Sequence, residues 1–256
     1  MPIVKGLPRV VGRTLLAILG LVFAFVLVGH VYSFHARKRA EHLLRDLQTL
    51  NVGTSDKEDA MRIITRYGGW EMEPTPDPRD IAPWGIPPWS GPHRRFGIRV
   101  APDALNRSVD ALPLLRYLGF HVWGVTATID VKDGKVLYVS QDVGFERSDG
   151  HEITTRATML PEFSSSYDSG TYSVHSHFIR HYIHQLTASV LPTASKDEKS
   201  RAFRVELACA TSFGGCYYTC ELAPLVWDDL SQRSKKEGWE VEGENDPRCR
   251  LPRQKP

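Results

Sequence analysis

The sequence predicts an α+β fold in which one N-terminal transmembrane helix and a pair of juxtamembrane helices precede a mainly antiparallel sheet packed with one or two helices. Three patterns predict it: an apolar stretch without Asp, Glu, Lys or Arg, then apolar stripes with helical spacing, then apolar residues that alternate as in strands. The predicted segments are a tail (1–13), the membrane helix (14–34), a juxtamembrane helical pair (35–69), a Pro-rich strap or linker (70–92), an α+β domain (93–242) and a flexible tail (243–256).

The apolar stretch from Thr14 to Phe34 is long enough to span a bilayer once. At about 1.5 Å per residue, a helix of this length covers the roughly 30 Å hydrocarbon core, where a helix satisfies its own backbone amides. A cleaved signal peptide is a poorer interpretation, because Phe34 is too large for its position before the best cleavage site. We therefore expect an uncleaved, single-pass signal anchor in contact with the lipid bilayer.

The side of the membrane on which the domain lies is predicted from two opposing signals. The basic flanks lean slightly towards a cytoplasmic domain, with Lys5, Arg9 and Arg13 before the span and Arg37, Lys38, Arg39 and Arg45 after it. Against this, an even set of cysteines favours disulfides and an oxidising compartment, namely Cys209, Cys216, Cys220 and Cys249. We give the cysteines more weight and expect an extracytoplasmic domain, with three disulfide pairings open.

The charge of the chain argues against one class of partner. The formal net charge is +2, and a nucleic-acid surface needs a clustered excess of basic residues, so we expect no nucleic acid. The basic residues gather at the flanks of the span, where attraction to anionic lipid accounts for them.

A heptad-like stripe follows the span, formed by Ala36, Ala40, Leu43, Leu47 and Leu50. The favoured interpretation is a juxtamembrane helix that lays this stripe on its own domain, because a coiled coil needs about three or four heptads. The alternative is a parallel homodimer through residues 14–50, in which Gly20 and Ala24 allow close approach of two spans.

A second helix is predicted after Ser55-Asp56-Lys57-Glu58, which has the form of a capping box, and it ends at Gly68-Gly69. The run Leu-x-Val-Gly-Thr-Ser-x-x-Glu-x-Ala, ending in Tyr-Gly, covers residues 50–69 and resembles the start of small envelope lipoproteins of the SmpA/OmlA type. The chain lacks their lipidatable cysteine near the N-terminus, so no functional residue carries over. The resemblance implies a bacterial cell-envelope protein.

The rest of the domain is predicted from short patterns. Seven prolines in residues 73–92 indicate a stiff strap or linker. Asp133-Gly134 between two strand-like runs, residues 120–131 and 136–145, is a strong hairpin signal. The other expected elements are strands at 96–100, 152–159 and 203–209, a short helix at 112–118, a Ser-rich loop at 164–170 and a helix at 222–236 that stops at Gly238.

Histidines between His175 and His184 are the strongest candidates for chemistry. If residues 178–190 are helical, spacings of four and three place His177, His181 and His184 on one side, close enough to share a Zn²⁺ ion. A solvated helix face rich in histidine is the plainer interpretation, and a pH-sensing face is a third. Glu152 and the serines 164–166 have no partner spacing that defines a base or a triad.

The favoured function is a membrane-anchored binding or scaffolding module without catalysis of its own, with another envelope or membrane protein as partner. The alternative is a metal-dependent or hydrolytic enzyme that uses the His175–His184 cluster. The sequence contains no Walker loop, G-x-G-x-x-G or G-x-S-x-G motif, and the cysteine spacing fits no paired C-x-x-C zinc pattern.

Overall fold

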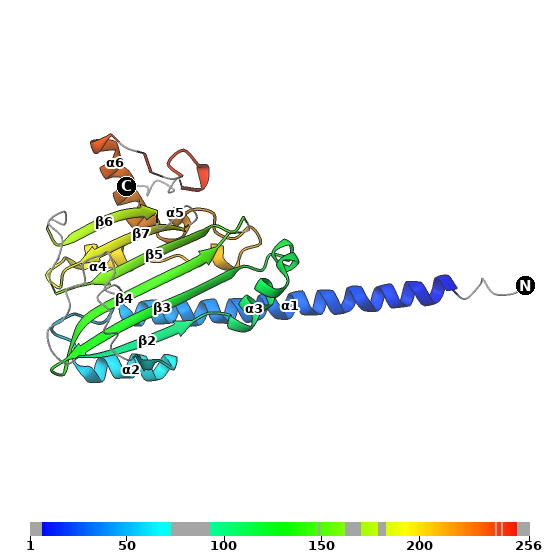
Figure 1. Ribbon diagram of the computed structural model, residues 1–256, viewed down its shortest axis with the longest axis horizontal. Coiled ribbons are helices and arrows are strands. Elements are labelled where there is room, and N and C mark those ends of the chain that lie inside the picture. The colour runs from blue at the N-terminus through cyan, green and yellow to red at the C-terminus, as the bar shows by residue number, and fades with distance from the viewer. Residues whose placement is uncertain are drawn as a thin grey trace, which may run out of the picture.

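The computed structural model describes residues 7–72, 93–147, 149–161, 170–178, 183–238, 240–241 and 243–249. It is a mixed α+β structure with a seven-stranded sheet and one long N-terminal helix that projects from it (Figure 1). The predicted fold class is confirmed to this extent. Part of the strap (73–92), most of the Ser-rich loop (162–169) and the end of the tail lie outside the described residues.

Helix α1 (Leu7–Leu47) is one continuous helix of 41 residues. Its N-terminal half is long and apolar enough to cross a membrane, and none of its most apolar window is buried in the protein. The juxtamembrane helix expected from the stripe is therefore the direct continuation of the apolar helix. No proline or glycine occurs between His30 and Leu47, so nothing in this part of the sequence breaks the helix.

The sheet is antiparallel except for one pair of strands. Its order is β1-β2-β3-β4-β5-β7-β6, and β5 and β7 run parallel. The strands are β1 (Trp70–Met72), β2 (Arg94–Val100), β3 (Val122–Lys132), β4 (Lys135–Glu146), β5 (Glu152–Met159), β6 (Tyr172–Phe178) and β7 (Ile183–Val190). Asp133 and Gly134 both have positive φ, of 50° and 77°, as a two-residue turn between twisted strands requires, so the predicted hairpin is confirmed.

The helices pack on one face of the sheet (Figure 1). Besides the end of α1 they are α2 (Lys57–Tyr67), α4 (Lys196–Phe203), α5 (Thr219–Leu222) and α6 (Pro224–Glu237), while α3 (Asp103–Ala111) and the 3-10 turn η1 (Pro113–Leu118) lie at one end of the sheet. Two further 3-10 turns, η2 (Cys209–Thr211) and η3 (Pro247–Cys249), follow α4 and α6. Glycines in the left-handed conformation, Gly68 and Gly238, end α2 and α6 as predicted.

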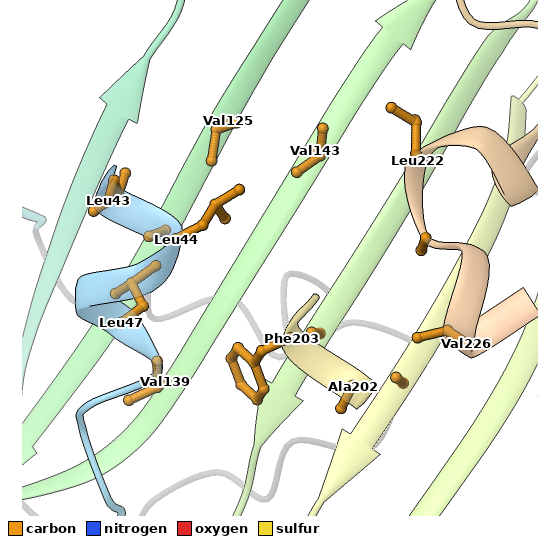
Figure 2. Close-up of a cluster of buried hydrophobic side chains, with 14 of the residues drawn as sticks. Leu43, Leu44, Leu47, Val125, Val139, Val143, Ala202, Phe203, Leu222 and Val226 are labelled. Atoms are coloured by element: carbon orange, nitrogen blue, oxygen red, sulfur yellow. The ribbon is translucent and has the colours of Figure 1, made fainter. Parts of the chain in front are cut away.

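The stripe of α1 lies in the core of its own domain, as the favoured interpretation predicted. Leu43 and Leu47 are fully buried and lie across from Val125, Val139 and Val143 of β3 and β4 (Figure 2). A homodimer through residues 14–50 could therefore not use the stripe of Leu43 and Leu47, because it is already buried in the domain.

Two predicted elements are wrong. Residues 203–209 are not a strand, because Phe203 is the last residue of α4, which begins at a capping box between Ser195 and Glu198. Residues 178–190 are not a helix, because β6 ends at Phe178 and β7 begins at Ile183, in parallel register with β5. In residues 183–190 the apolar spacing suggested a helix, whereas a backbone partner distant in the sequence, β5, makes them a strand. In residues 203–209 the alternation suggested a strand, whereas the local cap at Ser195 begins a helix that includes Phe203.

Smaller differences concern local boundaries. The N-cap of α2 is Asp56, whose side chain accepts a hydrogen bond from the Asp59 amide, whereas the predicted capping box began at Ser55. Residues 70–72, expected in the strap or linker, form the edge strand β1. Within the predicted flexible tail, Cys249 is joined to Cys220 by a disulfide, and the other disulfide joins Cys209 to Cys216.

We predict that Leu47→Ala lowers the free energy of unfolding by about 2–5 kcal/mol, because it leaves a cavity between α1 and the sheet. The matched control is Leu27→Ala on the same helix, where the side chain is 55% exposed outside the domain. Urea unfolding of both full-length variants in detergent micelles, followed by tryptophan fluorescence, measures the difference. Equal midpoints for the two variants would contradict the placement of the stripe.

Candidate functional site

The face of the sheet opposite the helices is polar. Side chains alternate along each strand, so Val125, Val143 and Ile153 point into the core while their neighbours point away from it. Near the end of the sheet where β3 begins, this outer face contains a groove with a volume of about 550 Å³. Its polar lining includes Arg99, Asn106, Asp142, Glu152, Arg156 and Gln185. We take this groove as the candidate site, because polar side chains from β2, α3, β4, β5 and β7 converge on it.

Helix α3 closes one end of the groove. The Asn106 side chain donates a hydrogen bond of 2.8 Å to the Trp123 carbonyl oxygen and is 6% exposed, so it fastens α3 to the start of β3. Arg99 forms an ion pair with Asp103 at 3.0 Å, which links β2 to the first turn of the same helix. The groove wall is therefore held by polar contacts between elements adjacent in the fold.

The floor of the groove carries a cross-strand ion pair. Asp142 of β4 and Arg156 of β5 are register partners, and the guanidinium of Arg156 donates to the Asp142 carboxylate. Burial raises the pKa of Asp142, and the attraction to Arg156 opposes this rise. The carboxylate is thus kept in a poorly solvated place where its charge depends on one partner.

Glu152 is the second carboxyl group of the groove and has a different environment. It is paired across the sheet with Glu146, whose own carboxylate binds the Arg116 guanidinium. The described residues give Glu152 no ion pair, and its pKa is raised first by burial and then by repulsion from Glu146. Gly144 leaves space for it, since a Cβ there would lie 3.3 Å from Glu152 Oε1. A carboxyl group of this kind can hold or release a proton at the groove surface.

Two buried polar atoms of the groove lack a partner. Gln185 is only 4% exposed, and neither its Oε1 atom nor Oγ1 of Thr154 has a hydrogen-bond partner within the described structure. The two residues are register neighbours on β7 and β5. A buried acceptor without a partner costs about 1–3 kcal/mol, so a bound hydroxyl, amide or ammonium group would be stabilised here.

Of the histidines in the predicted metal site, the described structure places the side chain of His184 alone. His184 lies in β7, is 6% exposed, and its Nε2 atom is 2.8 Å from Ser176 Oγ. The register pairs His177 with Gln185, one residue beyond His184. His181 lies outside the described residues. The helical spacing on which the three-histidine hypothesis was based does not exist in β7.

A metal site elsewhere has no support among the residues that can be placed: they contain no group of three or more His, Cys, Asp or Glu suited to hold an ion. The four cysteines that could have been ligands are all paired in disulfides.

Sequence analysis missed the groove residues. Asp142, Gly144 and Glu146 alternate along β4, and Glu152, Thr154 and Arg156 alternate along β5, so a polar period of two was present in both strands. That pattern indicates an outer face, but the pairing of these two polar rows becomes visible only with the register of β4 on β5. No residue at a fixed spacing along the sequence identified a partner for Glu152, because its neighbour Glu146 lies on the adjacent strand.

Comparison of the chain with protein-family models, with curated proteins and with solved structures found no match. The resemblance of residues 50–69 to small envelope lipoproteins therefore stays a prediction.

We predict that Glu152→Gln changes the pH dependence of stability. Because its pKa is raised from the ordinary 4.5, folded Glu152 binds its proton more tightly than the unfolded chain does, so its ionisation lowers the unfolding free energy as pH rises through the raised pKa. Glutamine does not ionise, so the variant does not lose this stability. The unfolding free energy of the variant minus that of the wild type should therefore increase from about pH 4 to about pH 7.

Urea unfolding across this pH range measures the effect, with Glu240→Gln, an exposed carboxyl group, as the control. A stability difference for Glu152→Gln that does not vary with pH would contradict the raised pKa.

Proposed function

We propose that this chain is a single-pass membrane protein whose extracytoplasmic domain is a binding module. Its ligand would be a polar group, on an envelope molecule or another membrane protein, that is held in the outer-face groove. The observation that carries the proposal is the groove itself, where buried acceptors of Gln185 and Thr154 lie next to the carboxyl group of Glu152 and have no hydrogen-bond partner among the described residues.

Membrane anchoring is supported by the exposure of the apolar half of α1. Leu16, Leu21 and Phe23 are each about 70% exposed. Exposing so much apolar surface to water is unfavourable, whereas a bilayer would cover it. The helix continues into the core without a break, so the anchor and the domain form one body.

An extracytoplasmic location is supported by the two disulfides, which persist in oxidising compartments. The basic residues after the span have a structural role as well. Arg37 donates to Glu41 and to Thr211, and Arg39 donates to the Tyr67 carbonyl oxygen. These cations attach the domain to α1, so counting them as an orientation signal gives them too much weight.

Location is tested by thiol labelling of cells with a membrane-impermeant reagent. We expect the chain to stay with membranes after alkaline carbonate extraction, and Cys249 to be labelled in intact cells once the disulfide to Cys220 is reduced. A variant with all four cysteines changed to serine gives the background. Labelling that appears only after lysis would contradict the orientation, and release of the chain by carbonate would contradict the anchor.

The binding function is tested by site-specific photo-crosslinking in membranes. A photoreactive residue at Thr126, an exposed position of the groove lining, should form an adduct, whereas the same residue at Arg62, exposed on α2, should not. Gln185→Leu in the Thr126 chain should remove the adduct while circular dichroism stays unchanged, because a leucine cannot hydrogen-bond the ligand. Equal adducts at both positions, or an adduct that Gln185→Leu does not affect, would contradict a groove ligand.

A further inference from the structure

An apolar platform lies beside the exposed half of α1. It consists of Leu112, Leu114 and Tyr117, in and next to η1, and of Phe213, which follows η2; these side chains are 61%, 72%, 79% and 70% exposed. Outside α1, the only other exposed large hydrophobic residue in the described part of the chain is Trp70. Exposed apolar side chains gathered in this way indicate an interaction surface.

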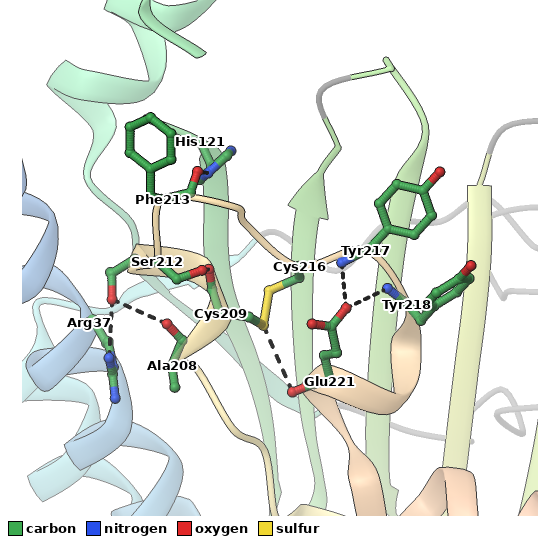
Figure 3. Close-up of a disulfide and its surroundings, with 11 residues drawn as sticks. Arg37, His121, Ala208, Cys209, Ser212, Phe213, Cys216, Tyr217, Tyr218 and Glu221 are labelled. Atoms are coloured by element: carbon green, nitrogen blue, oxygen red, sulfur yellow. Dashed lines mark hydrogen bonds between the residues drawn. A yellow bond between two sulfur atoms is a disulfide. The ribbon is translucent and has the colours of Figure 1, made fainter. Parts of the chain in front are cut away.

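The two parts of the platform are joined to each other. Phe213 packs on Gly119, where a Cβ would lie 2.6 Å from its Cδ2 atom, and its carbonyl oxygen is 3.2 Å from Nε2 of His121 (Figure 3). The disulfide between Cys209 and Cys216 closes the loop that carries Phe213. The platform is therefore a built surface and not a set of free loop ends.

The platform is also fastened to α1 within its apolar stretch. The ring of Phe120, directly after Gly119, stacks on His30 at 4.7 Å and meets Phe25 edge-on at 6.1 Å. Gly29 permits this approach, because a Cβ there would lie 2.7 Å from the Phe120 ring. Nε2 of His30 lies 3.3 Å from the Leu118 carbonyl oxygen, which adds a polar contact to η1.

These contacts set the depth of the platform if α1 spans a bilayer. A hydrocarbon core of roughly 30 Å that begins at Thr14 ends near Phe34. The residues that touch Phe120, from Phe25 to His30, lie four to nine residues before that level, or about 6–14 Å deeper at about 1.5 Å per residue. If the residues from Phe25 to His30 were instead placed outside the hydrocarbon core, the span would have to begin earlier in the sequence. Arg13 and Arg9 would then lie in hydrocarbon, which is costly.

The composition of the platform suits lipid. Between Ala111 and Phe120 the one charged residue is Arg116, whose guanidinium is turned towards Glu146 and the Arg147 carbonyl oxygen. Residues 207–220 contain no Asp, Glu, Lys or Arg. Leucine and phenylalanine partition into the acyl boundary, and a tyrosine ring favours the headgroup layer.

We propose that this platform inserts into the interfacial layer of the same bilayer that α1 spans, so that the domain has two attachments and a defined orientation on the membrane. The inference rests on the proposed membrane anchor. It also deepens the binding proposal, because the groove lies at the same end of the sheet, where Val122 and Trp123 of its lining directly follow Phe120 and His121. The groove would open close to the membrane surface.

The test places a fluorescent probe on single cysteines of the full chain in phosphatidylcholine vesicles. All four native cysteines are in disulfides, so a new cysteine is labelled selectively without reductant. The platform variants are Leu114→Cys and Tyr117→Cys, the anchor control is Leu21→Cys, and the distant control is Lys135→Cys at the other end of β3 and β4 (Figure 1). Quenching is measured with lipids that carry a nitroxide near the headgroup or deep in the acyl chain.

We expect both platform probes to be quenched several-fold more by the shallow nitroxide than the Lys135→Cys probe, and the Leu21→Cys probe to be quenched best by the deep one. If the Leu21→Cys probe is quenched while both platform probes behave like the distant control, the platform proposal is overturned and the anchor is kept. Platform probes that instead self-quench or crosslink between chains would overturn it in favour of a second copy. An unquenched Leu21→Cys probe overturns the anchor and the platform together.

Discussion

The packing of one half of α1 into the domain is the interaction on which the rest of the structure depends. Leu43 and Leu47 are buried against β3 and β4, while the other half of the same helix presents its apolar side chains outward. Because the helix has no break, the domain cannot swing on a flexible tether. The position of the apolar half therefore sets the position of the sheet, and Phe120 and His30 strengthen this coupling at the junction.

The sheet separates stability from binding. Its inner face carries the apolar core, and its outer face carries the paired Asp142 and Arg156, the buried Gln185, and Glu152, which has no ion pair within the described part of the chain. Poorly solvated carboxyl groups and a buried acceptor without a partner lower stability, and a fold keeps such groups most often where they contact a ligand. Since the groove and the apolar platform occupy the same end of the sheet, membrane attachment and ligand access would be coupled.

Local signals in the sequence were interpreted correctly where the backbone conformation depends on neighbouring residues. Asp133-Gly134 must adopt positive φ and forms the hairpin, and Gly68 and Gly238 end helices for the same reason. The apolar spacing of residues 178–190 predicts a helix, whereas the parallel partner β5, distant in the sequence, makes residues 183–190 a strand. The apolar residues in 203–209 alternate as in a strand, but Phe203 belongs to a helix that begins at the Ser195 cap. Leu207 lies in a segment without regular secondary structure, and its side chain is buried.

By itself the sequence determined an apolar helix near the N-terminus, a chain of α+β class with a Gly-directed hairpin, and an even number of cysteines. Only the tertiary structure decided that Cys209 pairs with Cys216, that Glu152 faces Glu146, and that Phe213 lies on Gly119 beside η1. The physical reason is range. Hydrophobic periodicity and turn chemistry act over a few residues, whereas a groove or a surface is assembled from side chains whose proximity depends on sheet register and helix docking.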